Sequence, residues 1–105
     1  MTNQPPRPPY MAVPKLWELR ENVLFGDVWE RPELSKRDRS MITVAVLANQ
    51  GRVDELRGHL GRALDNGVTR EELSELITHV AFYAGWPSAV GAARLAQEVF
   101  DERGI

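Results

Sequence analysis

The sequence contains no cysteine, and this absence excludes several kinds of chemistry at once. Without thiols, the chain forms no disulfide, holds no thiolate zinc site and carries no CxxC redox pair. Histidine is also scarce, with two among the 105 residues, and the spacing matches no zinc-binding pattern. The longest apolar run is Met41 to Ala48, whereas a membrane-spanning helix needs about 20 residues. We therefore expect no metal, no cofactor and no membrane span.

The chain also has no large excess of positive or of negative charge. The formal net charge is −2 and the sequence pI is about 5.7, so the basic surface that a nucleic-acid partner requires is missing. Hydrophobic residues make up 43% and charged residues 27%, which is typical of a globular domain rather than a disordered chain. The N-terminus has no charged-then-apolar signal pattern, so a cytoplasmic location is expected.

Proline is concentrated at the N-terminus, where five of the seven prolines fall: Pro5, Pro6, Pro8, Pro9 and Pro14. Proline lacks an amide donor and fixes φ, which favours an extended, polyproline-like or disordered arm. Such an arm is either a free tail or a segment that reaches over a neighbouring subunit. We expect residues 1–13 to form this arm and residues 14–105 to form a single helical domain.

Apolar residues recur at helical spacing through the rest of the chain, and no alternating strand pattern appears. Start and stop signals, among them a capping box from Thr69 to Glu72, divide this region into helices. The sequence therefore predicts an all-α fold with about five main helices: from Pro14 to Gly26, from Ser35 to about Gln50, from about Arg52 to Asp65, from Thr69 to Gly85 and from Pro87 to about Glu102.

Two of these helices have features that reach beyond local structure. The segment Met41 to Ala48 is apolar nearly all the way round, so it must be covered on most sides. A chain of this length provides little covering by itself, which favours a homo-oligomer. The third predicted helix has an apolar stripe that begins at Val53. Between the first and second predicted helices, Trp29 is expected to fill the edge of the core rather than to stack on a ligand.

The candidate chemical groups lie on the third and fourth predicted helices. Glu55 and His59 are four residues apart and share one helix face, either as an acid/base pair or as an ordinary surface pair. His79 lies beside the apolar stripe of the fourth helix, as a catalytic or a buried structural histidine.

Several motifs at fixed spacing resemble the carboxymuconolactone decarboxylase family. The resemblance is closer to its γ-carboxymuconolactone decarboxylase branch than to its alkylhydroperoxidase-D-like branch. It covers residues 25 to 100 or so, and the matching pieces are Trp29 to Pro32, Arg39-Ser40, Asp54-Glu55-Leu56 with His59, Asn66 to Thr69, His79-Val80-Ala81, Tyr83-Ala84-Gly85 and Pro87.

This resemblance implies a compact alkylhydroperoxidase-D-like helical protomer that assembles into trimers or hexamers. It also implies a cofactor-free decarboxylase of aromatic compound catabolism, acting on a small carboxylated lactone such as γ-carboxymuconolactone. The peroxidase-linked branch uses a CxxC pair ahead of a histidine, where this chain has Arg52 to Glu55 before His59, so that activity is excluded. Family members usually have a longer, basic N-terminal segment in place of the proline-rich arm. This difference leaves a second hypothesis, a non-catalytic or accessory oligomer of the same fold.

The implied reaction needs no cofactor, because the lost CO2 leaves its electrons on the conjugated lactone carbonyl as a dienolate. The enzyme must then supply a cation, a donor at the oxyanion and an acid that protonates carbon. We expect Arg39 or Arg52 as the cation and His59 or His79 as donor or acid. Glu55 is expected to orient the His59 imidazole or to shuttle a proton. Tyr83 and Trp86 are expected as substrate contacts or as core or interface residues. If the protein is an enzyme, Glu55, His59 and His79 should converge on one pocket with an arginine at its mouth. If it is an accessory protein, these residues should be scattered.

Overall fold

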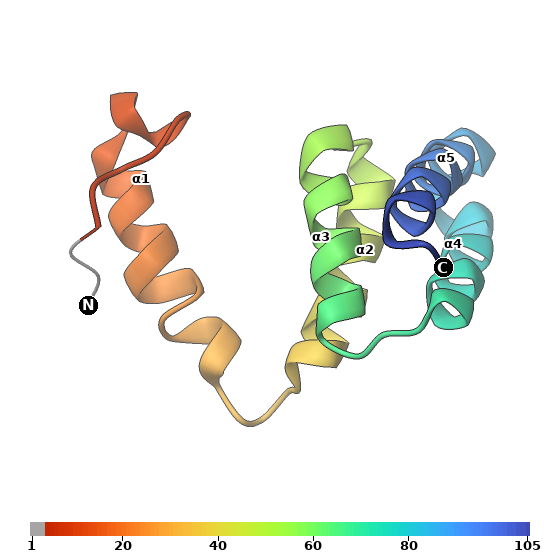
Figure 1. The fold of residues 1–105 in the computed structure, drawn as a ribbon, viewed down its shortest axis with the longest axis horizontal. Coiled ribbons are helices and arrows are strands. Elements are labelled where there is room, and N and C mark those ends of the chain that lie inside the picture. Colours follow the sequence, from red (N-terminus) through yellow and green to blue (C-terminus); the bar gives the residue numbers. More distant parts are fainter. Residues whose placement is uncertain (1–3) are drawn as a thin grey trace. The chain divides into compact units, whose positions relative to one another are not determined.

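The computed structural model describes residues 4–105, and this part of the chain contains helices and turns but no strand (Figure 1). The predicted all-α fold with five main helices is confirmed. The main helices are α1 (Pro14–Leu19), α2 (Lys36–Gln50), α3 (Val53–Asp65), α4 (Arg70–Ala84) and α5 (Trp86–Arg103), with short helical turns at Tyr10–Ala12, Arg20–Leu24 and Val28–Glu30.

The chain divides into two compact units, of which the first ends at Lys36 and the second spans Arg37–Ile105. The first unit is organised around Trp17, which is buried. The Tyr10 ring lies 5.4 Å from the Trp17 ring, and the Arg7 guanidinium lies 4.9 Å from its centroid. The indole N–H of Trp17 donates to the carbonyl of Gln4. The described part of the proline-rich arm therefore packs on Trp17 and is neither a free tail nor a regular polyproline helix.

The first predicted helix continues beyond α1 as a π-helical turn, Arg20–Leu24. This helical segment ends before Gly26, as the sequence predicts. At Gly26 there is no room for a side chain. A Cβ on Gly26 would meet the backbone oxygens of Glu21 and Asn22 at 2.6 and 2.8 Å. Beyond this turn Trp29 is buried, with its ring 5.8 Å from that of Phe25. Trp29 thus completes the core of the first unit.

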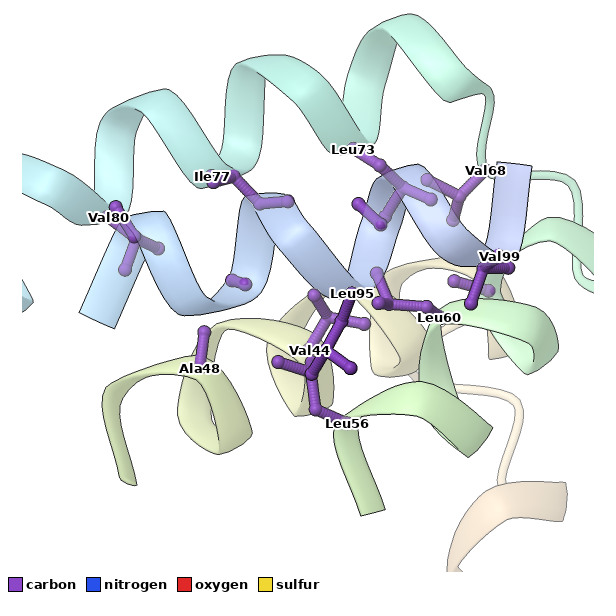
Figure 2. Close-up of a cluster of buried hydrophobic side chains, with 14 of the residues drawn as sticks. Val44, Ala48, Leu56, Leu60, Val68, Leu73, Ile77, Val80, Leu95 and Val99 are labelled. Atoms are coloured by element: carbon purple, nitrogen blue, oxygen red, sulfur yellow. The ribbon is translucent and has the colours of Figure 1, made fainter. Parts of the chain in front are cut away.

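The second unit has one apolar core, to which α2, α3, α4 and α5 all contribute (Figure 2). α5 packs against both α3 and α4. Its small residues fit this position, because they let the neighbouring helices approach closely. Ala92 and Ala96 are buried, together with Leu95, Val99 and Phe100. The central helix of this unit is therefore α5, whereas the sequence pattern draws attention to α2.

Turn chemistry sets the ends of these helices. The predicted capping box is present: the Thr69 hydroxyl accepts from the Glu72 amide, and the Glu72 carboxylate accepts from the Thr69 amide. α4 reverses into α5 through Gly85, whose φ of 103° lies in the region that favours glycine. The Arg70 guanidinium, at the start of α4, lies 4.9 Å from the Phe100 ring near the end of α5. α4 and α5 therefore form an antiparallel hairpin.

Polar contacts join the remaining helices. Ser40 is fully buried near the start of α2, and its hydroxyl accepts a hydrogen bond from the Asn66 amide that follows α3. Arg103 of α5 donates to Asp65 and to the carbonyl of Gly61, at 2.8 and 3.1 Å. These bonds fix the second half of α3 against both α2 and α5.

The apolar helix α2 is covered on one face only within the second unit. Val44 and Ala48 are buried, whereas Ile42 is 54% and Val46 is 47% exposed. The expected covering on most sides is therefore absent within the second unit. The prediction that the apolar stripe of α3 begins at Val53 is wrong. Val53 is 57% exposed, because it occupies the first turn of α3, beyond the reach of the core.

Candidate functional site

The second unit has an open hollow of about 430 Å³ between the C-terminal halves of α2 and α4. Two of its lining residues are His79 and Tyr83, one helical turn apart on α4. Their rings lie 4.9 Å apart at an interplanar angle of 32°. Both side chains are exposed, so His79 is not buried within the second unit. The structure thus brings two of the predicted site residues together.

The rest of the hollow is mainly aliphatic. Small apolar residues of α2 and α4 form most of it: Ala45, Val46, Val80 and Ala84. Asn49, in the last turn of α2, adds a third polar side chain. Sequence reasoning missed Asn49, because no spacing links it to His79, which lies thirty residues further along the chain. An apolar wall with a few converging polar groups is typical of a small-molecule site.

Helix direction gives this hollow a definite electrostatic character. α2 ends at Gln50 and α4 ends at Ala84, so the last turns of both helices flank the hollow. A helix C-terminus carries about half a negative charge, which disfavours a carboxylate and favours a cation. None of the residues that line the hollow is an arginine or a lysine. A carboxylated ligand therefore needs a cation from its surroundings.

The two predicted arginines differ in their distance from this hollow. Arg52 lies three residues beyond Asn49, in the turn between α2 and α3, where its amide donates to the carbonyl of Leu47 at 3.1 Å. Its side chain is exposed and makes no ion pair to any residue within 4–105. Arg39 stands in the first half of α2, six residues before Ala45, the first residue of α2 that lines the hollow, or about 9 Å along the helix axis. Neither arginine lines the hollow, and Arg52 is the nearer of the two to it along the chain.

The predicted acid/base pair Glu55 and His59 lies on α3 and does not line this hollow. Glu55 is exposed, and His59 is half-buried with its Nδ1 atom shielded from solvent. Within the second unit, the two histidines thus occupy different helices and different environments.

Trp86 faces a second depression, which we call the α4–α5 groove, of about 270 Å³. Phe82 lines it as well, and the two rings meet edge to face with centroids 6.4 Å apart. Phe82 and Tyr83 are neighbours in sequence, yet Phe82 lines the groove and Tyr83 lines the hollow. The predicted substrate contacts Tyr83 and Trp86 are therefore divided between two surfaces.

Within residues 4–105, no group of three or more histidine or acidic side chains is arranged to hold a metal ion. In the same part of the chain, no helix has the length and apolar character needed to cross a membrane.

Comparison with known proteins assigns the chain to a family. Residues 14–98 match the model of the carboxymuconolactone decarboxylase family. The chain belongs to this family. A 4-carboxymuconolactone decarboxylase of Acinetobacter baylyi is 51% identical over 81 residues, which are 77% of this chain and 60% of that protein.

Two further relatives of the family are more distant. The nitrosuccinic acid decarboxylase npaB of Metarhizium robertsii is 35% identical over 85 residues, 81% of this chain and 59% of the relative. An uncharacterized protein of Paracoccus denitrificans is 31% identical over 80 residues, 74% of this chain and 60% of the relative. The chain thus spans about 60% of the length of the curated relatives it matches.

Proposed function

We propose that this protein is a cofactor-free decarboxylase of small carboxylated lactones such as γ-carboxymuconolactone, and that the reaction takes place in the hollow between α2 and α4. The observation that carries the proposal is the pairing of His79 with Tyr83 over an apolar hollow, in a chain 51% identical to a 4-carboxymuconolactone decarboxylase. The names of two relatives from different organisms, both decarboxylases, support the reaction class.

The reaction proceeds through the substrate's own electron sink. The bond between the ring carbon and the carboxylate breaks, CO2 leaves, and the electron pair spreads through the double bond onto the lactone carbonyl. A protonated His79 then gives its proton to carbon and takes another from water. Nitrosuccinic acid also carries an electron-withdrawing group, the nitro group, so decarboxylation without a cofactor is chemically reasonable for both kinds of substrate.

Each remaining residue of the site has a proposed role. Arg52 binds the carboxylate that the negative helix ends would otherwise repel. The Tyr83 hydroxyl donates a hydrogen bond to the developing oxyanion, and its ring holds the imidazole of His79 in place. Glu55 and His59 remain candidates for a proton relay on α3, and Arg39 remains a second candidate cation. Trp86 lines the α4–α5 groove and not the hollow, so it has no role in this proposed site.

Assembly and location belong to the same proposal. We propose a homo-oligomer, a trimer or a hexamer, that works in the cytoplasm. The exposed side chains of Ile42 and Val46 on the apolar helix α2 support an oligomer, because an association would cover them. Fractionation of cells that express the protein would test the location.

The direct test is turnover. Purified full-length protein should convert γ-carboxymuconolactone with release of one CO2 per molecule, without added metal or cofactor and in the presence of a chelator. An accessory protein of the same fold would bind no lactone and release no CO2. A folded protein that leaves the substrate unchanged would therefore contradict the proposed function.

A further inference from the structure

A third depression of about 250 Å³ runs along the first half of α4 and the second half of α5, and we call it the Arg70 pocket. Its polar lining includes Arg70 and Ser74 of α4 and Gln97 of α5. It adjoins the α4–α5 groove, with which it shares a few lining residues, but it shares none with the α2–α4 hollow. A molecule in this pocket would therefore occupy a place separate from the proposed reaction site.

The guanidinium of Arg70 is held in position without a carboxylate partner. Its central carbon lies 4.9 Å from the centroid of the Phe100 ring, which is buried. Stacking on an aromatic ring occupies the face of a guanidinium and leaves the N–H groups at its edge available. Within residues 4–105, Arg70 makes no ion pair and its side chain donates no hydrogen bond. These N–H groups are therefore available to a ligand.

The surroundings of Arg70 differ from those of other arginines in the second unit. Three of these contact an acidic side chain directly: Arg37 contacts Glu72, Arg57 contacts Glu98, and Arg103 contacts Asp65. None of the residues that line the Arg70 pocket is acidic. Within the pocket, no carboxylate of the protein thus competes with an anionic ligand for Arg70.

Two further polar side chains of the pocket can contact the same ligand. Ser74 follows Arg70 by one helical turn, which places both on one face of α4. Its carbonyl accepts from Thr78, but its own hydroxyl makes no hydrogen bond within the described residues. The Gln97 amide nitrogen donates to Asp101 at 2.8 Å, which orders this side chain and leaves its oxygen as an acceptor.

The apolar part of the lining restricts the kind of anion that fits. Ile77, Ala96 and Phe100 are all buried residues that border the pocket. An inorganic anion gains nothing from such a wall, whereas the carbon skeleton of an organic acid is stabilised by it. A carboxylate also matches the planar fork of a guanidinium, with two parallel hydrogen bonds. Pockets for drug-sized ligands hold about 300–1,000 Å³, so the ligand here must be small.

We propose that the Arg70 pocket binds a small organic carboxylate, at a site distinct from the α2–α4 hollow. The N–H edge of Arg70 holds the two carboxylate oxygens, and the Ser74 hydroxyl donates a further hydrogen bond. The carbon skeleton of the ligand packs on Ile77 and Ala96. Because the pocket is built from both helices, its ligand stabilises the α4–α5 hairpin by mass action.

The first test is a titration of the full chain with sodium benzoate at constant ionic strength, followed by ¹H–¹⁵N correlation NMR. The amide signals of Ser74 and Gln97 should shift and reach saturation. Benzamide has nearly the same shape but no charge, so it should bind at least about tenfold more weakly. Inorganic phosphate should be weaker by a similar factor, because it lacks an apolar body. Equal binding of either compound would overturn the proposal.

The second test compares two arginines of similar exposure. Arg70→Gln should weaken benzoate binding at least about tenfold, because the charge and the fork are both lost. Arg94→Gln is the matched control: Arg94 is exposed on α5, makes no ion pair within the described residues and lines none of the three depressions. This control should change the affinity by less than about twofold. Arg70→Lys keeps the charge without the fork and should also weaken binding, which preserves the test if Arg70→Gln fails to fold.

The outcomes separate this inference from the proposed function. Saturable shifts at Ser74 and Gln97 that are lost in Arg70→Gln and retained in Arg94→Gln would support the pocket. No saturable shift at these two residues, or an equal loss in both glutamine variants, would overturn it. Shifts confined to His79 and Tyr83 would place benzoate in the α2–α4 hollow, which would overturn the Arg70 pocket and leave the proposed function standing.

Discussion

The two histidine-bearing helices, α3 and α4, differ in what surrounds their imidazoles. On α3, His59 is half-buried and follows Glu55 by one turn, which is the arrangement that sequence reasoning favours. On α4, His79 is exposed, stacks near Tyr83 and lines a hollow with Asn49 and small apolar residues. His79 thus borders a space in which a ligand fits, whereas His59 lines neither the hollow nor the α4–α5 groove. The comparison predicts that the two histidines contribute unequally to turnover.

The largest effect is expected for His79→Ala. Loss of the acid that protonates the dienolate should lower kcat and kcat/KM together by about 10²-fold or more, since the contact forms mainly in the transition state. Steady-state kinetics of the folded variant on γ-carboxymuconolactone measures this change. Unchanged kcat would remove His79 from the mechanism.

A smaller effect is expected for His59→Ala. A residue that lies outside the hollow affects protonation only through a relay, so kcat should fall by roughly tenfold. Glu55→Gln should cost less than this, because Glu55 would act only by orienting the His59 ring. If His59→Ala lost as much activity as His79→Ala, the ranking of the two helices would be wrong.

Substitution of either arginine should change KM rather than kcat, and the two variants should differ in the size of this change. Arg52→Ala should raise KM by roughly tenfold with little change in kcat, because a carboxylate clamp binds the ground state and the transition state almost alike. Arg39→Ala should raise KM less, since Arg39 stands in the other half of α2. If Arg39→Ala raised KM more than Arg52→Ala, the substrate carboxylate would be bound away from the α2–α3 turn.

The smallest effect concerns stability and involves neither histidine. The hydrogen bond from Arg103 holds the pKa of the Asp65 carboxyl below its ordinary value of 3.8. A lowered native pKa stabilises the fold above pH 3.8, and this contribution is lost as the pH falls through the native value. Asp65→Asn should therefore lower Tm at pH 7, by less than about 4 °C for so exposed a pair. If the wild type and Asp65→Asn still differed in Tm below the native pKa of Asp65, the difference in stability would have another cause.

Local signals in the sequence were sufficient for the helices. Gly51, Gly85 and the Thr69–Glu72 box predict the ends of α2 to α5 to within a residue or two, because turn and cap chemistry is local. The folding of the arm onto Trp17 was not predictable in this way, since it depends on contacts with Gln4 and Arg7.

The candidate site was predictable only in part. His79 and Tyr83 carry a spacing that the sequence displays, whereas their hollow exists only because α2 packs beside α4. Asn49 contributes to the hollow for that reason alone, and no pattern along the chain identifies it. Tyr83 and Trp86 are both predicted substrate contacts, yet they line different depressions.

The most direct test of the α2–α4 hollow uses the fact that the chain has only two histidines. Proton NMR of the imidazole signals would be followed while a saturated carboxylated lactone is added; this ligand lacks the ring double bond and so has no electron sink through which to lose CO2. His79→Gln and His59→Gln variants assign the two signals. We predict that the His79 signal shifts on binding while the His59 signal stays nearly constant. A shift of His59 with His79 unchanged would contradict the account and place the substrate on α3.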